Sequence, residues 1–162
     1  SLINYDDTAS RSMARIKYNN RREYLDFYSE AMVRKMGKRI RSMDGDALIP
    51  VPVHPSRLRE RGFNQAEELA RRLSVPLGIP VNTSVLKRER KTAPQKNLDS
   101  SGRLKNLEQA FTAAALPSAM QKVILVDDIY TTGSTIEACA RVLRKAGAEH
   151  VYFVTIFIGH GQ

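Results

Sequence analysis

The chain has 162 residues, a formal net charge of +9, and a composition that is 42% hydrophobic and 27% charged, which is ordinary for one globular domain with a buried core. No apolar run approaches the roughly 18 residues needed to span a bilayer, and no signal segment opens the chain, so we expect a cytoplasmic protein without a membrane span. One cysteine excludes an intramolecular disulfide and a cysteine-rich metal site, and the three histidines show no metal-ligand spacing.

The basic excess lies upstream of residue 123. Residues 123–162 hold 3 basic and 4 acidic side chains, so they contribute nothing to the positive net charge. A basic balance favours an anionic partner, either nucleic acid or a phosphorylated metabolite. A solvated basic surface is the alternative, and the charge alone does not separate the two.

The N-terminal segment, residues 1–45, is predicted to be helical. Apolar residues recur near one face over about 21–41, which predicts one helix there. We expect a single domain over residues 1–162, with this helical segment packed on it.

A strand and a second helix follow. The run "ALIPVPV" at 47–53 predicts a short strand, in which the two prolines indicate an irregular or edge-like path. A basic loop over 54–61 then leads into a helix at 64–73. Asn64 and Glu67 resemble a capping box at the start of that helix.

The middle of the chain predicts a strand near 80–87 and then a mobile loop. Residues 87–105 hold seven basic and two acidic side chains, with few apolar residues and several Pro, Ser and Gly breakers. The run "EQAFTA" at 108–113 can pair back as a strand.

The last 40 residues contain a buried strand at 122–128, a helix at 134–147 and another buried strand at 150–158. A strand, helix and strand in this order form a right-handed parallel unit, so we expect an α/β fold, a largely parallel sheet flanked by helices. Cys139 has helical apolar spacing within 134–147 and is expected to be a small core residue rather than a nucleophile.

The stretch "VILVDDIYTTGST" at 123–135 carries the clearest chemistry. The carboxyl ends of strands in an open parallel sheet face the ligand crevice, and Asp127 and Asp128 lie at such an end. The hydroxyls and glycine of 131–135 lead into a helix N-terminus, and this combination forms a phosphate cradle. Two carboxylates beside a phosphate site can accept hydrogen bonds from sugar hydroxyls or help to hold Mg²⁺. The ligand implied is a sugar phosphate.

A structural interpretation of the same stretch competes with this one. Ser134 and Glu137 fit a capping box, and an acid after a strand is common turn chemistry. The combination of strand, paired acids, "TTGST" and helix is more specific than any of its parts.

This stretch resembles the phosphoribosyl pyrophosphate (PRPP) motif of type I phosphoribosyltransferases. The resemblance implies that Asp127 and Asp128 bind the ribose hydroxyls. It also implies a 5′-phosphate site formed by Thr131, Thr132, Gly133, Ser134 and Thr135. The motif is not a P-loop, because it has no Gly-Lys-Ser/Thr ending.

A second region resembles the competence protein F (ComF/GntX-like) branch of that family. The stretch at 49–70 contains the pattern R-G-F-N-Q at 61–65, and 93–111 carries further residues typical of the branch, namely Gln95, Leu98, Arg103, Asn106 and Phe111. The likeness covers about residues 45–158. It implies the type I phosphoribosyltransferase fold, with a flexible loop or hairpin over the site.

The resemblance places the pyrophosphate loop at residues 54–61. Arg57, Arg59 and Arg61 of that loop can supply paired donors to pyrophosphate, although a solvated basic loop would have the same composition. Residues 87–105 match the family's flexible loop. Its candidate anion contacts are Lys87, Arg88, Arg90, Lys91 and Lys96.

The implied activity is Mg²⁺-dependent transfer of phosphoribosyl from PRPP to an acceptor, with Mg²⁺ held by PRPP and by Asp127 and Asp128. These two acids and Arg61 are the candidate catalytic residues. Thr131 stands where purine-salvage relatives carry an aspartate base, which argues against hypoxanthine or guanine as the acceptor. The acceptor therefore stays unidentified.

Alternatives remain open at this point. One is a non-catalytic module that senses PRPP while its basic surface binds nucleic acid in DNA uptake. Another is an α/β domain for a different phosphorylated ligand. Members of the resembled family usually form homodimers, and ComF-like proteins often carry an N-terminal zinc module built from cysteine pairs, which this sequence does not contain.

Overall fold

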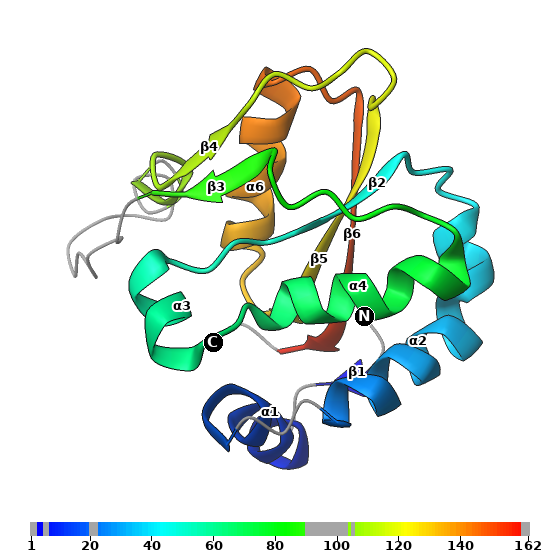
Figure 1. The fold of residues 1–162 in the computed structure, drawn as a ribbon, viewed down its shortest axis with the longest axis vertical. Coiled ribbons are helices and arrows are strands. Elements are labelled where there is room, and N and C mark those ends of the chain that lie inside the picture. Colours follow the sequence, from blue (N-terminus) through cyan, green and yellow to red (C-terminus); the bar gives the residue numbers. More distant parts are fainter. Residues whose placement is uncertain (1–2, 5–6, 20–22, 90–103, 105, 160–162) are drawn as a thin grey trace.

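The computed structural model of the chain describes residues 3–4, 7–19, 23–89, 104 and 106–159. Its elements in chain order are β1 (Ile3–Asn4), α1 (Asp7–Asn19), α2 (Glu23–Arg41), β2 (Ala47–Pro50), α3 (Pro55–Arg61), α4 (Gln65–Leu77), β3 (Leu86–Arg88), β4 (Phe111–Ala113), β5 (Lys122–Tyr130), α6 (Ser134–Lys145) and β6 (His150–Ile158) (Figure 1). Within these residues no helix is long and apolar enough to cross a membrane.

Four parallel strands form the main sheet, in the order β1-β6-β5-β2. β5 and β6 pair along their whole length, from Lys122 opposite His150 to Tyr130 opposite Ile158. β3 and β4 form a separate antiparallel hairpin. The predicted α/β fold with a parallel sheet flanked by helices is confirmed. Of the run at 108–113, only Phe111–Ala113 pair back onto the preceding strand.

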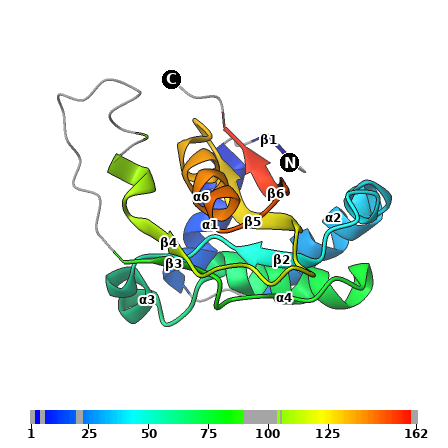
Figure 2. The ribbon, with the colours of Figure 1, turned by 90° about the horizontal axis from the view of Figure 1, so that it is seen from above.

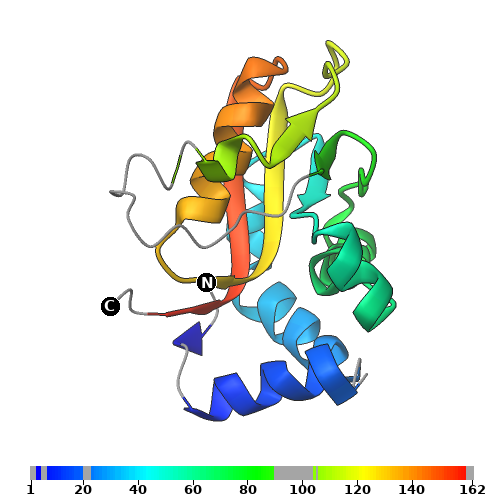
Figure 3. The ribbon, with the colours of Figure 1, turned by 90° about the vertical axis from the view of Figure 1, so that its left-hand side faces the viewer.

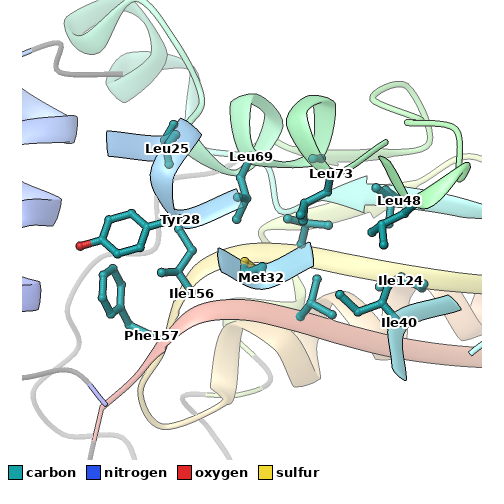
Figure 4. Close-up of a cluster of buried hydrophobic side chains, with 14 of the residues drawn as sticks. Leu25, Tyr28, Met32, Ile40, Leu48, Leu69, Leu73, Ile124, Ile156 and Phe157 are labelled. Carbon is teal, nitrogen blue, oxygen red and sulfur yellow. The ribbon is translucent and has the colours of Figure 1, made fainter. Parts of the chain in front are cut away.

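Helices cover both faces of the main sheet, with α2 and α4 on one side and α6 with the β3–β4 hairpin on the other (Figures 1 and 2). The side chains of β5 alternate between these layers, because successive residues of a strand point to opposite faces. Ile124 and Val126 enter the cluster formed with α2 and α4, part of which is drawn in Figure 4. Val123 and Leu125 enter the cluster formed with α6.

The N-terminal helices are joined to the core by apolar side chains. Met13 and Ile16 of α1 are buried in the same cluster as the α2 residues, and the ring of Tyr28 meets that of Phe157 edge-on, with centroids 5.1 Å apart. The Tyr28 hydroxyl also donates to Ser12 Oγ at 2.8 Å. α1 lies beyond the carboxyl ends of β5 and β6 (Figures 1 and 3), the end of the sheet at which the sequence predicts the ligand.

The basic segment 54–61 forms a helix, so the prediction of a loop there was wrong. His54 begins α3 by accepting the amide of Ser56 at its Nδ1, 3.1 Å away, and Pro55 occupies the first turn, where its missing N–H costs nothing. Gly62 ends the helix in the left-handed region, at φ 78°. Local capping is strong enough to order seven residues that lack an apolar face.

Several element boundaries also differ from the sequence predictions. β2 ends at Pro50 rather than at residue 53, although the Val51 amide still donates to Val126 O at 2.9 Å. The expected strand near 80–87 is reduced to a bridge at Val81 and to β3. Between these two, the Asn82 side chain accepts the amides of Ser84 and Val85, and this turn interrupts the strand.

The predicted helix at 64–73 is α4, which continues to Leu77. Asn64 is its N-cap, as expected, and accepts the Ala66 amide at 3.1 Å. Within the part of the chain that the structure describes, Glu67 forms an ion pair with Arg71 rather than a capping box with Asn64.

Candidate functional site

Asp127 and Asp128 lie within β5, close to its carboxyl end. The strand continues beyond residue 128 to Tyr130, because β6 is long enough to pair with it as far as Ile158. Asp128 is buried, with 6% of its surface exposed, and its side chain reaches Gln65 of α4. Asp127 is half-buried and lies opposite Thr155 in the register with β6. The side chains of the two neighbouring acids therefore point to opposite faces of the sheet.

Backbone amides orient both carboxylates. Asp127 Oδ1 accepts the Asp128 amide at 2.8 Å, and Asp128 Oδ1 accepts the Ile129 amide at 3.0 Å. Hydrogen bonds to an ionised carboxylate are stronger than those between neutral groups. The second oxygen of Asp128, Oδ2, accepts from Gln65 Nε2 at 3.4 Å, so the position of this carboxylate is fixed by both of its oxygens.

The loop predicted to hold phosphate connects β5 to α6. Thr131 and Thr132 are exposed, whereas Gly133, Ser134 and Thr135 are half-buried. The hydroxyls of Thr132 and Ser134 lie 3.0 Å apart, so both can turn toward one ligand.

The competing capping-box interpretation of this loop was wrong. Gly133, not Ser134, is the N-cap of α6, and no side-chain hydrogen bond caps the helix there. Glu137 forms an ion pair with Arg141, one turn further along. The Thr132 hydroxyl lies 3.5 Å from the amide of Ser134, the first residue of α6, so the loop folds back on the start of the helix.

Gly133 is required at its position for two reasons. Its φ of 78° lies in the left-handed region, and a Cβ at this residue would collide with the ring hydroxyl of Tyr130. The Tyr130 ring in turn stacks on Phe153 of β6, with centroids 5.2 Å apart and an interplanar angle of 14°. The shape of the loop is thus set by an aromatic pair beneath it.

The predicted pyrophosphate-binding arginines lie on α3. Arg57 and Arg59 are exposed, and Arg61 is half-buried in the last turn. Arg61 Nη1 donates to Gln65 Oε1 at 3.4 Å, which connects this helix to the acid-pair side of the sheet. Among the residues that the structure describes, no hydrogen bond joins Arg59 to either acid.

Among the predicted anion contacts, Arg88 on β3 lies near enough to Asp127 for the two charges to influence each other. Burial lowers the pKa of its guanidinium, as does the neighbouring positive charge of Arg57, while Asp127 acts in the opposite direction. Its guanidinium carbon lies 5.3 Å from the centre of the Phe111 ring. Arg57, Arg88 and Asp127 are therefore electrostatic neighbours, although they come from three separate elements. Lys87 is exposed on β3, and Arg90, Lys91 and Lys96 lie outside the described residues.

Cys139 is fully buried in α6, as predicted. Burial raises the pKa of its thiol far above the ordinary value, and the nearby Asp127 carboxylate raises it further. The thiol is therefore protonated at neutral pH, which excludes it as a nucleophile.

The sequence predicts Asn64 as a helix cap but gives no role to Gln65, which stands next to it in the R-G-F-N-Q pattern. Asn64 Nδ2 donates to Val51 O at 3.0 Å, which ties the start of α4 to the end of β2. Gln65 is buried, with 5% exposed, and Gln65 Nε2 donates to Asp128 Oδ2 at 3.4 Å. The helical spacing of the sequence could have predicted that Gln65 is buried, because it lies on the same face of α4 as Leu69 and Leu73.

One carboxylate of the acid pair could join a Mg²⁺ ion that a phosphorylated ligand brings with it. Within the described ranges, no group of three or more His, Cys, Asp or Glu side chains could hold a metal by itself. Mg²⁺ commonly keeps several waters and binds through one or two carboxylates together with substrate phosphates. Either Asp127 or Asp128 supplies such a carboxylate.

Comparison with known proteins identifies the family of this site. The sequence model of the phosphoribosyl transferase domain matches residues 58–162, which include the acid pair, the phosphate loop, Arg61 and Arg88. The chain belongs to the phosphoribosyl transferase domain family. Arg57 falls just outside the matched range of this domain.

Individual relatives place this phosphoribosyl transferase domain in the competence protein F branch. Competence protein F from Haemophilus influenzae is 40% identical over 108 residues, which are 65% of this chain and 47% of that protein. DNA utilization protein YhgH from Salmonella typhimurium is 30% identical over 154 residues, which are 93% of this chain and 67% of that protein. The chain thus spans about half the length of the first relative and two thirds of the second.

A solved structure, the purine phosphoribosyltransferase from Pyrococcus horikoshii, covers 80% of this chain and 72% of its own at 19% identity and a TM-score of 0.49.

Proposed function

We propose that the domain binds PRPP together with Mg²⁺ and transfers its phosphoribosyl group to an acceptor. The observation that supports this most is the convergence of two kinds of charge at the end of β5. Asp127 and Asp128 come shortly before the hydroxyl loop 131–135 in the chain. Arg61 is linked to Asp128 through Gln65, and Arg88 is an electrostatic neighbour of Asp127. A ligand that needs all of these carries sugar hydroxyls, a terminal phosphate and a second anionic group.

Each part of PRPP then has a place. The acids accept hydrogen bonds from the ribose hydroxyls. The loop at 131–135 and the first turn of α6 hold the 5′-phosphate. Arg57, Arg61 and Arg88 neutralise the pyrophosphate, since guanidinium groups form paired hydrogen bonds with phosphate oxygens.

In the proposed reaction, the bond between ribose C1 and the pyrophosphate oxygen breaks, and its electron pair leaves with pyrophosphate. The acceptor forms a new bond to C1 and gives up a proton. Asp127 and Asp128 would help to hold Mg²⁺, which would supply further charge neutralisation when bound. Arginines that neutralise the leaving group stabilise the transition state, so no protein nucleophile is needed. The protonated and buried Cys139 is consistent with this.

Titration of PRPP with Mg²⁺ by calorimetry tests the proposal. Wild-type protein is expected to bind, and Asp128→Asn to bind at least about tenfold more weakly, because a ribose hydroxyl loses a charged acceptor. Equal binding by both proteins, or binding by neither, would overturn the site assignment. Release of pyrophosphate in the presence of candidate nucleobases separates turnover from binding alone, and the Thr131 position argues for trying acceptors other than hypoxanthine and guanine.

A second function, binding of single-stranded nucleic acid, is favoured by a surface on the N-terminal helices. A cavity of about 690 Å³ there is lined in part by Arg11, Arg15, Tyr24 and Phe27. Phe27 is 61% exposed, and Arg15 Nη1 donates to the Tyr24 hydroxyl at 3.1 Å. An exposed aromatic ring beside arginines, here Phe27, is typical of sites on which an unpaired base stacks. Glu23 is the one acidic side chain among the described residues that line this cavity.

Fluorescence titration with a labelled oligonucleotide tests this second function. We expect binding that weakens with salt and that falls about tenfold in Phe27→Ala, in line with the loss of a stacked base. Val75→Ala is the control, because Val75 is 87% exposed on α4 and belongs to no such surface. Equal losses in the two variants would contradict the assignment of the surface.

A further inference from the structure

The pattern R-G-F-N-Q at 61–65 places a buried amide beside the acid pair. Gly62 ends α3 with a φ of 78°, and Phe63 is buried in the core. Asn64 caps α4 with its oxygen and holds Val51 O with its nitrogen. This arrangement fixes Gln65 as the first residue of α4, pointing into the sheet rather than to solvent.

Both ends of the Gln65 side chain are used. Its Nε2 donates to Asp128 Oδ2, and its Oε1 accepts from Arg61 Nη1, each at 3.4 Å. A guanidinium can only donate hydrogen bonds and an ionised carboxylate can only accept them. The amide orientation therefore follows from its partners, with nitrogen toward Asp128 and oxygen toward Arg61.

An uncharged side chain suits this position. A glutamate would face the Asp128 carboxylate without a donor, and an apolar side chain would leave the buried carboxylate without this hydrogen bond. Gln65 thus fixes the relative positions of Arg61 and Asp128, which are oppositely charged, without adding a charge of its own. Asp128 and Arg61 come from β5 and α3, which belong to different parts of the fold.

We propose that Gln65 is a positioning residue that couples the pyrophosphate end of the site, through Arg61, to the ribose end, through Asp128. The inference rests on the proposed function, since it assigns those two ends to the two parts of PRPP. Gln65 does not contact the reacting atoms in this scheme; it sets where Arg61 and Asp128 lie. Binding of one half of the ligand then favours the arrangement that binds the other half.

Two substitutions separate the ends of the amide. Gln65→Glu keeps an acceptor for Arg61 but replaces the donor to Asp128 by a repelling carboxylate. We expect its affinity for ribose 5-phosphate to fall about tenfold, while its affinity for inorganic pyrophosphate with Mg²⁺ changes less than about threefold. Gln65→Met removes both hydrogen bonds, so both affinities are expected to fall. Gln109→Met is the control, because Gln109 is exposed and far along the chain.

The outcomes of this experiment are distinct. The inference is overturned if Gln65→Glu changes the affinities for ribose 5-phosphate and for pyrophosphate equally, or changes neither. A merely structural role would affect the two affinities alike. If wild type binds PRPP and the Gln65 variants bind with the same affinity, the inference is overturned and the proposed function stands. Failure of wild type to bind PRPP and both half-ligands overturns the proposed function, and the inference with it.

A double-mutant cycle tests the coupling without any substitution at Gln65, so the result does not depend on whether the Gln65 variants fold. Arg61→Lys and Asp128→Asn leave Gln65 in place, and coupling through it predicts that their effects on PRPP affinity are non-additive by about threefold or more. Additive effects would overturn the coupling even if each single variant binds weakly. Thermal unfolding of every variant confirms that the compared proteins are folded.

Discussion

The guanidinium of Arg88 lies over the ring of Phe111, with 5.3 Å between the guanidinium carbon and the ring centroid. The two residues face each other across the β3–β4 hairpin, where they are paired in register. Phe111 therefore holds a half-buried cation beside Asp127 and Arg57, in a place where burial and a like charge both oppose its ionisation. Charged groups whose pKa is shifted by burial and by neighbouring charges are common at ligand-binding sites.

Replacement of Arg88 by methionine should separate stability from binding. Removal of a partly buried cation that repels Arg57 is expected to leave the free energy of unfolding unchanged or higher, while the affinity for PRPP with Mg²⁺ falls about tenfold or more. Calorimetric titration and chemical unfolding measure the two quantities. Arg71→Met is the matched control, since Arg71 pairs only at the surface with Glu67. Unchanged affinity in Arg88→Met would remove Arg88 from the site.

Gly133→Ala should be more damaging than the same change at another glycine of similar conformation. We expect Gly133→Ala to cost roughly 2–4 kcal/mol of unfolding free energy and to weaken PRPP binding, since the new methyl group meets the Tyr130 ring as well as an unfavourable φ. Gly78→Ala is the control: its φ of 70° is similar, but nothing lies within 4 Å of the added methyl group. That change should cost only about 1 kcal/mol and leave binding intact. Equal losses in the two variants would mean that the Tyr130 contact is unimportant.

Thr155→Val tests a buried hydroxyl opposite Asp127. Thr155 is fully buried, and within the described part of the chain its Oγ1 has no hydrogen-bond partner. Valine has nearly the same shape, so the substitution is expected to leave stability unchanged or to raise it by up to about 1 kcal/mol. Val123→Thr, which buries a new hydroxyl in β5, should instead destabilise by about 1–3 kcal/mol. A loss of PRPP affinity in Thr155→Val would show that the hydroxyl serves the site through Asp127.

The Cys139 thiol predicts a pH dependence of stability. Its pKa is raised in the folded state, so above the ordinary value of about 8.5 the unfolded thiol loses its proton while the folded one keeps it. The unfolded state is then favoured, and wild type should lose about 1.4 kcal/mol per pH unit relative to Cys139→Ala. Urea unfolding between pH 7.5 and 10 measures the difference, which should be constant below about pH 8. A difference that stays constant throughout would contradict the burial of the thiol in the native protein.

The strand, helix and motif predictions succeeded where the signal is local in the chain. The β5–α6–β6 unit follows from two apolar runs and an amphipathic segment, and the acid pair with its hydroxyl loop is contiguous. The errors have local causes too. The segment expected to be a basic loop forms α3, because it is capped by His54 and Gly62 and begins with Pro55. The strand expected near 80–87 is interrupted by the turn that the Asn82 side chain stabilises.

By itself, the sequence determined the α/β class, the order of the parallel unit, and the pairing of acids with a phosphate-type loop, because each depends on residues close together in the chain. Only the tertiary structure decided which distant groups reach that pair. Gln65 meets Asp128 across 63 positions because α4 packs on β5, and Arg88 lies near Asp127 because the hairpin covers the α6 face. Apolar burial drives both packings, and it brings buried polar groups to specific neighbours that no periodicity along the chain encodes.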